Sequence, residues 1–101
     1  MRVYISGPIT GHADYMAVFA TCATMLESMG YIVVNPATVA QRPDWTWADY
    51  MQYDLALLRG CDAIYMLSEW QHSKGACIER RYAKRKHIKL LTSLVLHSMH
   101  E

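Results

Sequence analysis

The sequence has little net charge and few charged residues, and this scarcity limits the partners it can have. Ten lysines and arginines stand against nine acidic residues, which gives a formal net charge of +1, and charged residues make up only 19% of the chain. We therefore expect no binding to nucleic acid through a basic field. Basic residues do gather between Arg80 and Lys89, a pattern typical of the solvated face of a helix.

Paired cysteines and long apolar runs are also absent. The three cysteines (Cys22, Cys61 and Cys77) are odd in number and form no Cys-x-x-Cys pair, which favours buried thiols in a reducing compartment. No apolar run approaches the length of a membrane span, and Met1-Arg2 leads straight into a predicted strand. We therefore expect a cytoplasmic protein with no signal peptide and no membrane partner.

Metal-ligand spacing is missing as well. Of the five histidines, His97 and His100 lie three residues apart, with no cysteine or aspartate partner nearby. We expect no metal and no cofactor.

Apolar residues, by contrast, make up 52% of the 101 residues, which is ample for one core in a single domain spanning residues 1–101. Short apolar runs closed by turn residues predict buried strands at residues 3–5, 31–34, 63–67 and 88–91. Apolar spacing predicts helices at residues 13–29, 46–58 and 74–86, with a short one at 93–101.

This alternation predicts an α/β fold: a flavodoxin- or Rossmann-like three-layer sandwich whose parallel sheet has four strands, or five, in the order 2-1-3-4. So small a sheet leaves apolar helix faces exposed, and we therefore expect a homodimer or a higher homo-oligomer.

Two glycine-bearing segments outline a binding site. Gly7-Pro8-Ile9-Thr10-Gly11 follows the first predicted strand, and Ser73-Lys74-Gly75-Ala76-Cys77-Ile78-Glu79 opens the third predicted helix. Ser73 is a good N-cap, and the first-turn N–H groups favour an anion there. Both segments and Asn35 fall at the carboxyl ends of parallel strands, where ligands bind in such sheets. The sequence therefore predicts a small-molecule cleft with Glu79 pointing across it.

A second carboxylate interrupts an apolar helix face. Asp54 lies on the same predicted helix stripe as Trp47, Tyr50, Met51, Leu55 and Leu58. An unpaired buried carboxylate is costly, so Asp54 is either a functional group or a loop cap.

The other candidates also have structural alternatives. Glu79 could pair with a basic neighbour on the surface, Tyr4 could be a core aromatic, and Asn35 could simply form a turn.

Four blocks of the chain together resemble the nucleoside 2-deoxyribosyltransferase-like superfamily, and in particular a branch often encoded by phages or prophages. The blocks span residues 2–91 and consist of Val3–Gly11, Asn35-Pro36, Tyr53–Asp62 and Ser73–Glu79. The resemblance implies cleavage or transfer of an N-glycosidic bond in a nucleoside or a nucleoside 5′-monophosphate. It implies Glu79 as the nucleophile, Tyr4 as the group that orients it, and Asp54 as an acid or base-positioning group.

The resemblance also implies a binding site for the nucleotide. Gly7 and Ile9 match a loop that packs on the nucleobase. Ser73 stands where the nucleotide hydrolases of the superfamily have a phosphate-binding serine and the transferases usually have an aspartate, which favours a phosphorylated ligand. Trp70 is expected either to cover the cleft or to occupy it. The candidate binding residues are thus Gly7, Pro8, Ile9, Gly11, Asn35, Trp70, Ser73 and Gly75.

Two other function classes stay open. A nucleotide-binding module without turnover would keep the cleft and use Glu79 to hold ribose hydroxyls. An assembly protein would keep only the fold.

Overall fold

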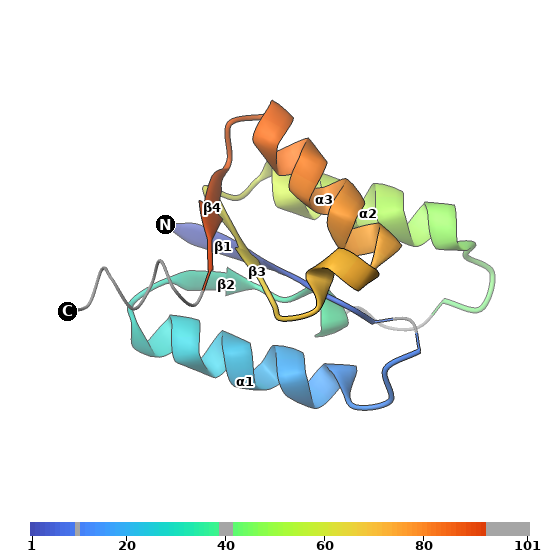
Figure 1. Cartoon of the computed structure of the whole chain (residues 1–101), viewed down its shortest axis with the longest axis horizontal. Helices are drawn as coiled ribbons and strands as arrows, with labels where there is room; N and C mark the ends of the chain where they lie inside the picture. The colour runs from blue at the N-terminus through green and yellow to red at the C-terminus, as the bar shows by residue number, and fades with distance from the viewer. Residues whose placement is uncertain (10, 39–41, 93–101) are drawn as a thin grey trace.

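One parallel sheet lies between helices on its two faces in the computed structural model, which describes residues 1–9, 11–38 and 42–92 (Figure 1). Its elements in chain order are β1 (Arg2–Ser6), α1 (Tyr15–Ser28), β2 (Ile32–Val34), the 3-10 turn η1 (Pro36–Thr38), α2 (Trp47–Arg59), β3 (Ala63–Met66), the 3-10 turn η2 (Trp70–His72), α3 (Lys74–Arg85) and β4 (Lys89–Leu91). The short helix predicted at 93–101 lies outside the described residues.

The sheet has four strands in the order β2-β1-β3-β4, and every pair is parallel. The α/β class, the strand order and the three-layer arrangement predicted from the sequence are therefore confirmed. Tyr4 sits at the centre of this sheet, opposite Val34 on one side and Ile64 on the other.

Side chains of successive β1 residues point to opposite faces of the sheet. Val3 and Ile5 pack with α1, in a buried cluster that includes Phe19 and Leu26. Tyr4 packs on the opposite face with residues of α2 and α3, including Leu58. Figure 1 shows α1 on one side of the sheet and both α2 and α3 on the other. Tyr4 and Ser6 consequently face α3, whereas Val3 and Ile5 belong to the core on the α1 side of the sheet.

The first half of α2 does not pack into the core. Its start is fixed by a capping box, in which the Thr46 hydroxyl accepts from the Asp49 N–H and the Asp49 carboxylate accepts from the Thr46 N–H. Leu58, near its end, is the residue of α2 that is fully buried. Trp47 remains 45% exposed. The apolar stripe predicted for this helix is thus divided between the core at its end and a cavity wall at its start.

The structure can be compared with two further expectations, buried thiols and the absence of a membrane-spanning helix. Cys22 and Cys61 are buried and Cys77 is half-buried, all three as free thiols. Within the described part of the chain, each helix is too short or too polar to cross a bilayer.

Gly7 is fixed by packing against β3. A Cβ atom at this position would lie 2.7 Å from Cδ1 and 2.8 Å from Cβ of Leu67. We expect Gly7→Ala to lower the free energy of unfolding by about 1–3 kcal/mol, as overpacking does, measured by urea denaturation.

Gly60→Ala is the matched control. A Cβ atom there would find its nearest neighbour, the Leu57 carbonyl oxygen, at 3.6 Å, so the change should stay within about 0.5 kcal/mol. Equal stability of Gly7→Ala and the wild type would contradict the packing role.

Candidate active site

Glu79 is a buried carboxylate held by two hydroxyl groups of the central strand. The Tyr4 hydroxyl donates to Oε2, and the Ser6 hydroxyl donates to Oε1 over 2.6 Å. Tyr4 and Ser6 are two residues apart on β1, so both side chains point to the face that α3 covers. Only 5% of Glu79 is exposed. It is therefore neither a surface ion-pair partner nor a simple complement to the helix dipole.

The environment of Glu79 favours its protonated form. Burial raises the pKa of Glu79 to about 7, against the opposing effect of the hydrogen bonds from Ser6 and Tyr4, and the charge of Asp54 raises it further. Burial also raises the pKa of Asp54 to about 6. The pKa of Tyr4 is raised by burial first, and then by the charges of Glu79 and Asp54. The three groups form one coupled cluster of acids.

Glu79 and Asp54 open into the same cavity of about 570 Å³, which is large enough for a small ligand. Its residues come from the end of β1, the loop that follows it, α1, η1, α2, η2 and the start of α3: Ile5, Gly7, Pro8, Ile9, His12, Tyr15, Phe19, Pro36, Ala37, Trp47, Tyr50, Met51, Asp54, His72, Ser73, Lys74, Gly75, Ala76 and Glu79. The wall is thus mainly apolar and aromatic. The polar groups are two carboxyls and a separate set on the loops and at the start of α3.

That second polar set consists of His12, His72, Ser73 and Lys74. Ser73 is the N-cap of α3, and its hydroxyl oxygen accepts from the Ala76 N–H over 3.1 Å. The hydroxyl hydrogen of Ser73 stays available for a ligand. The Lys74 ammonium lies 5.0 Å from the centre of the Trp47 ring, which places this charge beside the aromatic wall. This part of the cavity suits an anion.

Seven of the predicted site residues border the cavity: Gly7, Pro8, Ile9, Asp54, Ser73, Gly75 and Glu79. Tyr4 lies behind Glu79. At Gly75, a Cβ atom would meet Met51 Sδ at 3.3 Å, so a side chain here would require Met51 of α2 to shift by a few tenths of an ångström.

The remaining predicted residues lie outside that lining. Gly11 has φ +80°, a left-handed turn conformation that favours glycine. The Asn35 side chain accepts from the Ala37 N–H over 3.0 Å, which shapes the turn that carries Pro36 and Ala37 into the cavity wall. Asn35 thus acts on the cavity through its neighbours.

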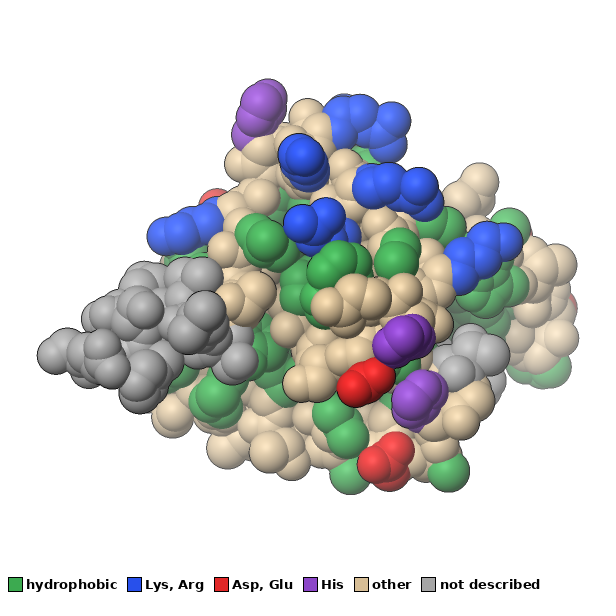
Figure 2. Space-filling model, viewed as in Figure 1, with side chains coloured by type: hydrophobic (Ala, Val, Ile, Leu, Met, Phe, Trp, Pro, Cys, Tyr) green, Lys and Arg blue, Asp and Glu red, His purple; other side chains and the backbone are tan. Residues whose placement is uncertain are grey.

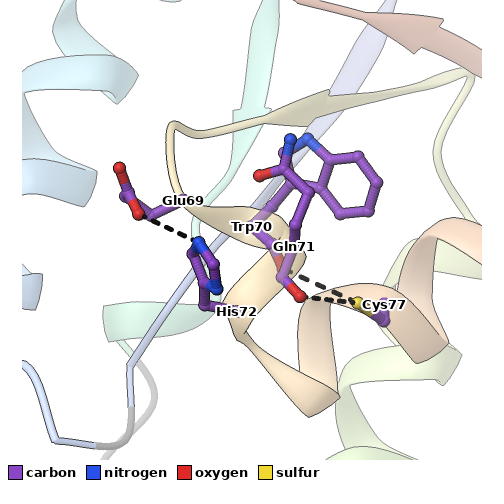
Figure 3. A network of polar contacts seen from close by, with 5 residues as sticks. All are labelled: Glu69, Trp70, Gln71, His72 and Cys77. Carbon is purple, nitrogen blue, oxygen red and sulfur yellow. Dashed lines mark hydrogen bonds and ion pairs between the residues drawn. The ribbon is translucent and has the colours of Figure 1, made fainter.

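Trp70 neither covers the cavity nor occupies it. Its ring packs against the buried cluster that contains Tyr4, and the Arg80 guanidinium lies 4.8 Å from the ring centre. Figure 3 shows how the turn is fastened: the Cys77 thiol donates to the carbonyl oxygens of Trp70 and Gln71, at 3.7 and 3.6 Å. This contact ties η2 to α3, and the η2 side chain that borders the cavity is His72.

His72 is also drawn towards an acidic neighbour. Its Nε2 lies 3.5 Å from a carboxylate oxygen of Glu69, a residue with the left-handed φ of 71° (Figure 3). Figure 2 shows Lys and Arg side chains gathered over α3, with His and acidic side chains close together below them. The basic run of the sequence is therefore a mostly exposed face of α3 and of the residues that follow it.

The predicted site residues did not include Ser6, which contacts Glu79, or the cavity-lining residues His12, Tyr50, His72 and Lys74. Ser6 could have been found from strand alternation, since it lies two residues beyond Tyr4. Among the described residues no group of three or more His, Cys, Asp or Glu side chains could hold a metal ion.

Comparisons with known proteins agree with this architecture. The family model described as "Domain of unknown function (DUF4406)" matches residues 1–92. None of the curated proteins matches the chain in sequence.

Two similar solved structures are those of deoxyribosyltransferases. A 2-deoxyribosyltransferase from Bacillus psychrosaccharolyticus has a TM-score of 0.71 and 11% identity, over 91% of this chain and 71% of its own. A 2-desoxiribosyltransferase from Leishmania mexicana has a TM-score of 0.68 and 21% identity, over 90% of this chain and 62% of its own. The chain therefore has a nucleoside 2-deoxyribosyltransferase-like fold, as the sequence predicted, and the phage branch stays a prediction.

The raised pKa of Glu79 predicts how stability depends on pH. An unfolded glutamate releases its proton near 4.5 and the folded one near 7, so between these values the folded state binds more protons. Stability should therefore fall as pH rises through this window and level off above it, with Glu79 contributing at most about 3 kcal/mol.

Urea denaturation at pH 5 and pH 8 measures this fall. Glu79→Gln should lose much of it, and so gain stability relative to the wild type at pH 8. Glu27→Gln, at an exposed position of α1, should follow the wild-type profile. Parallel profiles for Glu79→Gln and the wild type would contradict the buried, proton-binding carboxyl.

Proposed function

We propose that this chain, which belongs to the DUF4406 family, cleaves or transfers the N-glycosidic bond of a nucleoside or nucleoside 5′-monophosphate with Glu79 as nucleophile. The observation that carries the proposal is a buried carboxylate held by two hydroxyls, facing a cavity that contains a second carboxyl. A structural carboxylate would gain nothing from this opening, whereas a nucleophile needs both the support and the access.

The two carboxyls supply complementary steps. A Glu79 oxygen attacks the anomeric carbon as the bond to the base breaks, through an oxocarbenium-like state, and a glycosyl ester forms. The proton of Asp54 passes to the departing base. Water or a second base then displaces Glu79 from the sugar, and Asp54 takes up the proton released by that acceptor. The raised pKa of Asp54, about 6, supports its role as the proton donor near neutral pH.

The cavity wall supports binding of the base and of a phosphate at different places. Trp47 and Tyr50 of α2 offer aromatic surface on which a planar base can pack. Ser73 and the first-turn N–H groups of α3 offer hydrogen-bond donors, and Lys74 adds a positive charge. A nucleotide with its base against α2 and its phosphate at the start of α3 would use both. We therefore favour the 5′-monophosphate as substrate.

A nucleotide-binding module without turnover is the second candidate. The observation that favours it is the raised pKa of Glu79, about 7. A carboxyl that keeps its proton is a poor nucleophile but can donate a hydrogen bond to a ribose hydroxyl as well as accept one. In this alternative the same cavity sequesters a nucleotide.

Glu79→Gln tests the catalytic proposal. The amide keeps the size of the side chain and cannot form the glycosyl ester, so base release should fall by at least about a thousandfold. Release of free base from 2′-deoxynucleoside 5′-monophosphates, followed by chromatography, measures the rate. A thermal shift with the same nucleotides measures binding, which should persist.

Glu27→Gln is the control, because this exposed glutamate lies on α1 and outside the cavity lining. If the wild type releases no base from any common nucleotide or nucleoside but gains thermal stability from them, the enzyme proposal fails and the binding module stands. No thermal shift from any of them would contradict both.

Ser73→Asp tests the phosphate contact. Aspartate is an N-cap as good as serine, so the helix should survive, while its charge repels a phosphate. We expect affinity for a nucleoside 5′-monophosphate to fall at least about tenfold, and affinity for the unphosphorylated nucleoside to change less than about threefold. Isothermal titration calorimetry measures both.

Ser73→Asn is the matched control, since it keeps the cap without the charge. The difference between its effects on the affinities for the two ligands should be much smaller. Equal losses for both ligands in Ser73→Asp would remove the argument for a phosphate at this helix end.

A further inference from the structure

The hydrogen bond from Ser6 holds one of the two oxygens of the Glu79 carboxylate. Ser6 is 1% exposed, and its hydroxyl lies 2.6 Å from Glu79 Oε1, while Tyr4 holds the other oxygen. A serine hydroxyl has a single proton to donate, and here it goes to the carboxylate. Each oxygen of Glu79 therefore accepts one hydroxyl and keeps a lone pair free.

The backbone that carries Ser6 is held in place by β3. The Ser6 carbonyl accepts from the Leu67 N–H over 2.8 Å, and Ser6 pairs in register with Met66. The next residue, Gly7, has no room for a side chain beside Leu67. The position of the Ser6 hydroxyl is thus set by the sheet itself, at the point where β1 meets the cavity loop.

We propose that Ser6 is a positioning residue, whose hydroxyl acts with that of Tyr4 to keep the Glu79 carboxylate ionised and fixed in direction. The proposal rests on the function proposed above. Hydrogen bonds to the charged form favour that form, and two donors from one rigid strand fix the plane of the carboxylate. Burial by α3 acts the other way, since it favours the neutral acid. Ser6 offsets this penalty.

Several ionisable groups surround Glu79 and must be considered together. Tyr4 of β1 and Asp54 of α2 both act on it electrostatically. His12, His72 and Lys74 border the same cavity from the first loop, η2 and α3. Ser6 is not itself ionisable, and its hydroxyl contacts the carboxylate directly. Its removal should therefore change the proton affinity of Glu79 without adding or removing a charge.

Ser6→Ala is the test. Loss of a hydrogen bond to a charged group should raise the pKa of Glu79 by about one to two units. Carbon-13 NMR of protein labelled at the glutamate carboxyls measures this pKa, and Glu79→Gln identifies the resonance. In the proposed reaction the acid limb of kcat/KM should move to higher pH by the same amount, with KM for a nucleotide changed less than about twofold.

Two further variants separate this role from a merely structural one. Ser73→Asn also alters a polar side chain of the cavity, but it does not touch Glu79, and it should leave the pKa of Glu79 in place. Ser6→Cys adds a slightly larger side chain but keeps a donor, although a weaker one, so it should raise the pKa by a smaller amount. It also serves if Ser6→Ala does not fold, which near-ultraviolet circular dichroism would show.

The outcomes are distinguishable from those of the proposed function. A raised pKa in Ser6→Ala with a displaced acid limb supports the proposal. A raised pKa in a protein that releases no base supports the effect of Ser6 on Glu79 and contradicts the reaction. An unchanged pKa of Glu79 in folded Ser6→Ala or Ser6→Cys overturns the proposal, even where activity falls.

Discussion

The carboxylate of Glu79 lies between β1 and α3, and its two hydroxyl partners are the constraint on which the site depends. Burial of a charged group is costly unless hydrogen bonds compensate it. Here both donors, Tyr4 and Ser6, come from the strand at the centre of the sheet. A slip of one residue in the register of β1 would turn both hydroxyls to the α1 face. The correct register of β1 in the sheet is therefore also what places both hydroxyl donors beside Glu79.

The remainder of the site is built from segments that the core leaves free. The first half of α2 has an apolar face but contributes little to the buried clusters, and Trp47, Tyr50 and Met51 border the cavity instead. Asp54 continues this face, where a core helix would carry an apolar residue. Its raised pKa and that of Glu79 both mean that the folded chain holds protons that the unfolded chain releases. At neutral pH these two carboxyls therefore lower the free energy of unfolding, and they lie where the reaction is proposed to occur. Such destabilising groups are common at functional sites.

The strands, helices and sheet order could be predicted from the sequence because apolar periodicity and glycine or proline boundaries specify them locally. Asp54 could be singled out because a carboxyl on an apolar stripe contradicts the pattern. Strand alternation places Ser6 on the same face as Tyr4, but it does not show what Ser6 contacts, because a serine at the end of a strand looks like the start of a turn and its partner lies 73 residues away. Trp70 was misplaced for a related reason. Its direction depends on the left-handed Glu69 and on the tie from Cys77 to η2, which no local pattern reveals.

The chain shares its fold with two deoxyribosyltransferases, but a fold alone does not set the chemistry, which here depends on where one proton lies. Burial raises the pKa of Glu79 to about 7 and that of Asp54 to about 6, and the charge of Asp54 raises that of Glu79 further, so a proton can lie on either group near neutral pH. With that proton on Asp54, Glu79 is a nucleophile and Asp54 is the acid that releases the base. With it on Glu79, the same side chain can only hold a sugar hydroxyl. The hydroxyls of Tyr4 and Ser6 favour the first arrangement and burial favours the second. The balance between these opposing terms separates an enzyme from a binding protein on an otherwise identical scaffold.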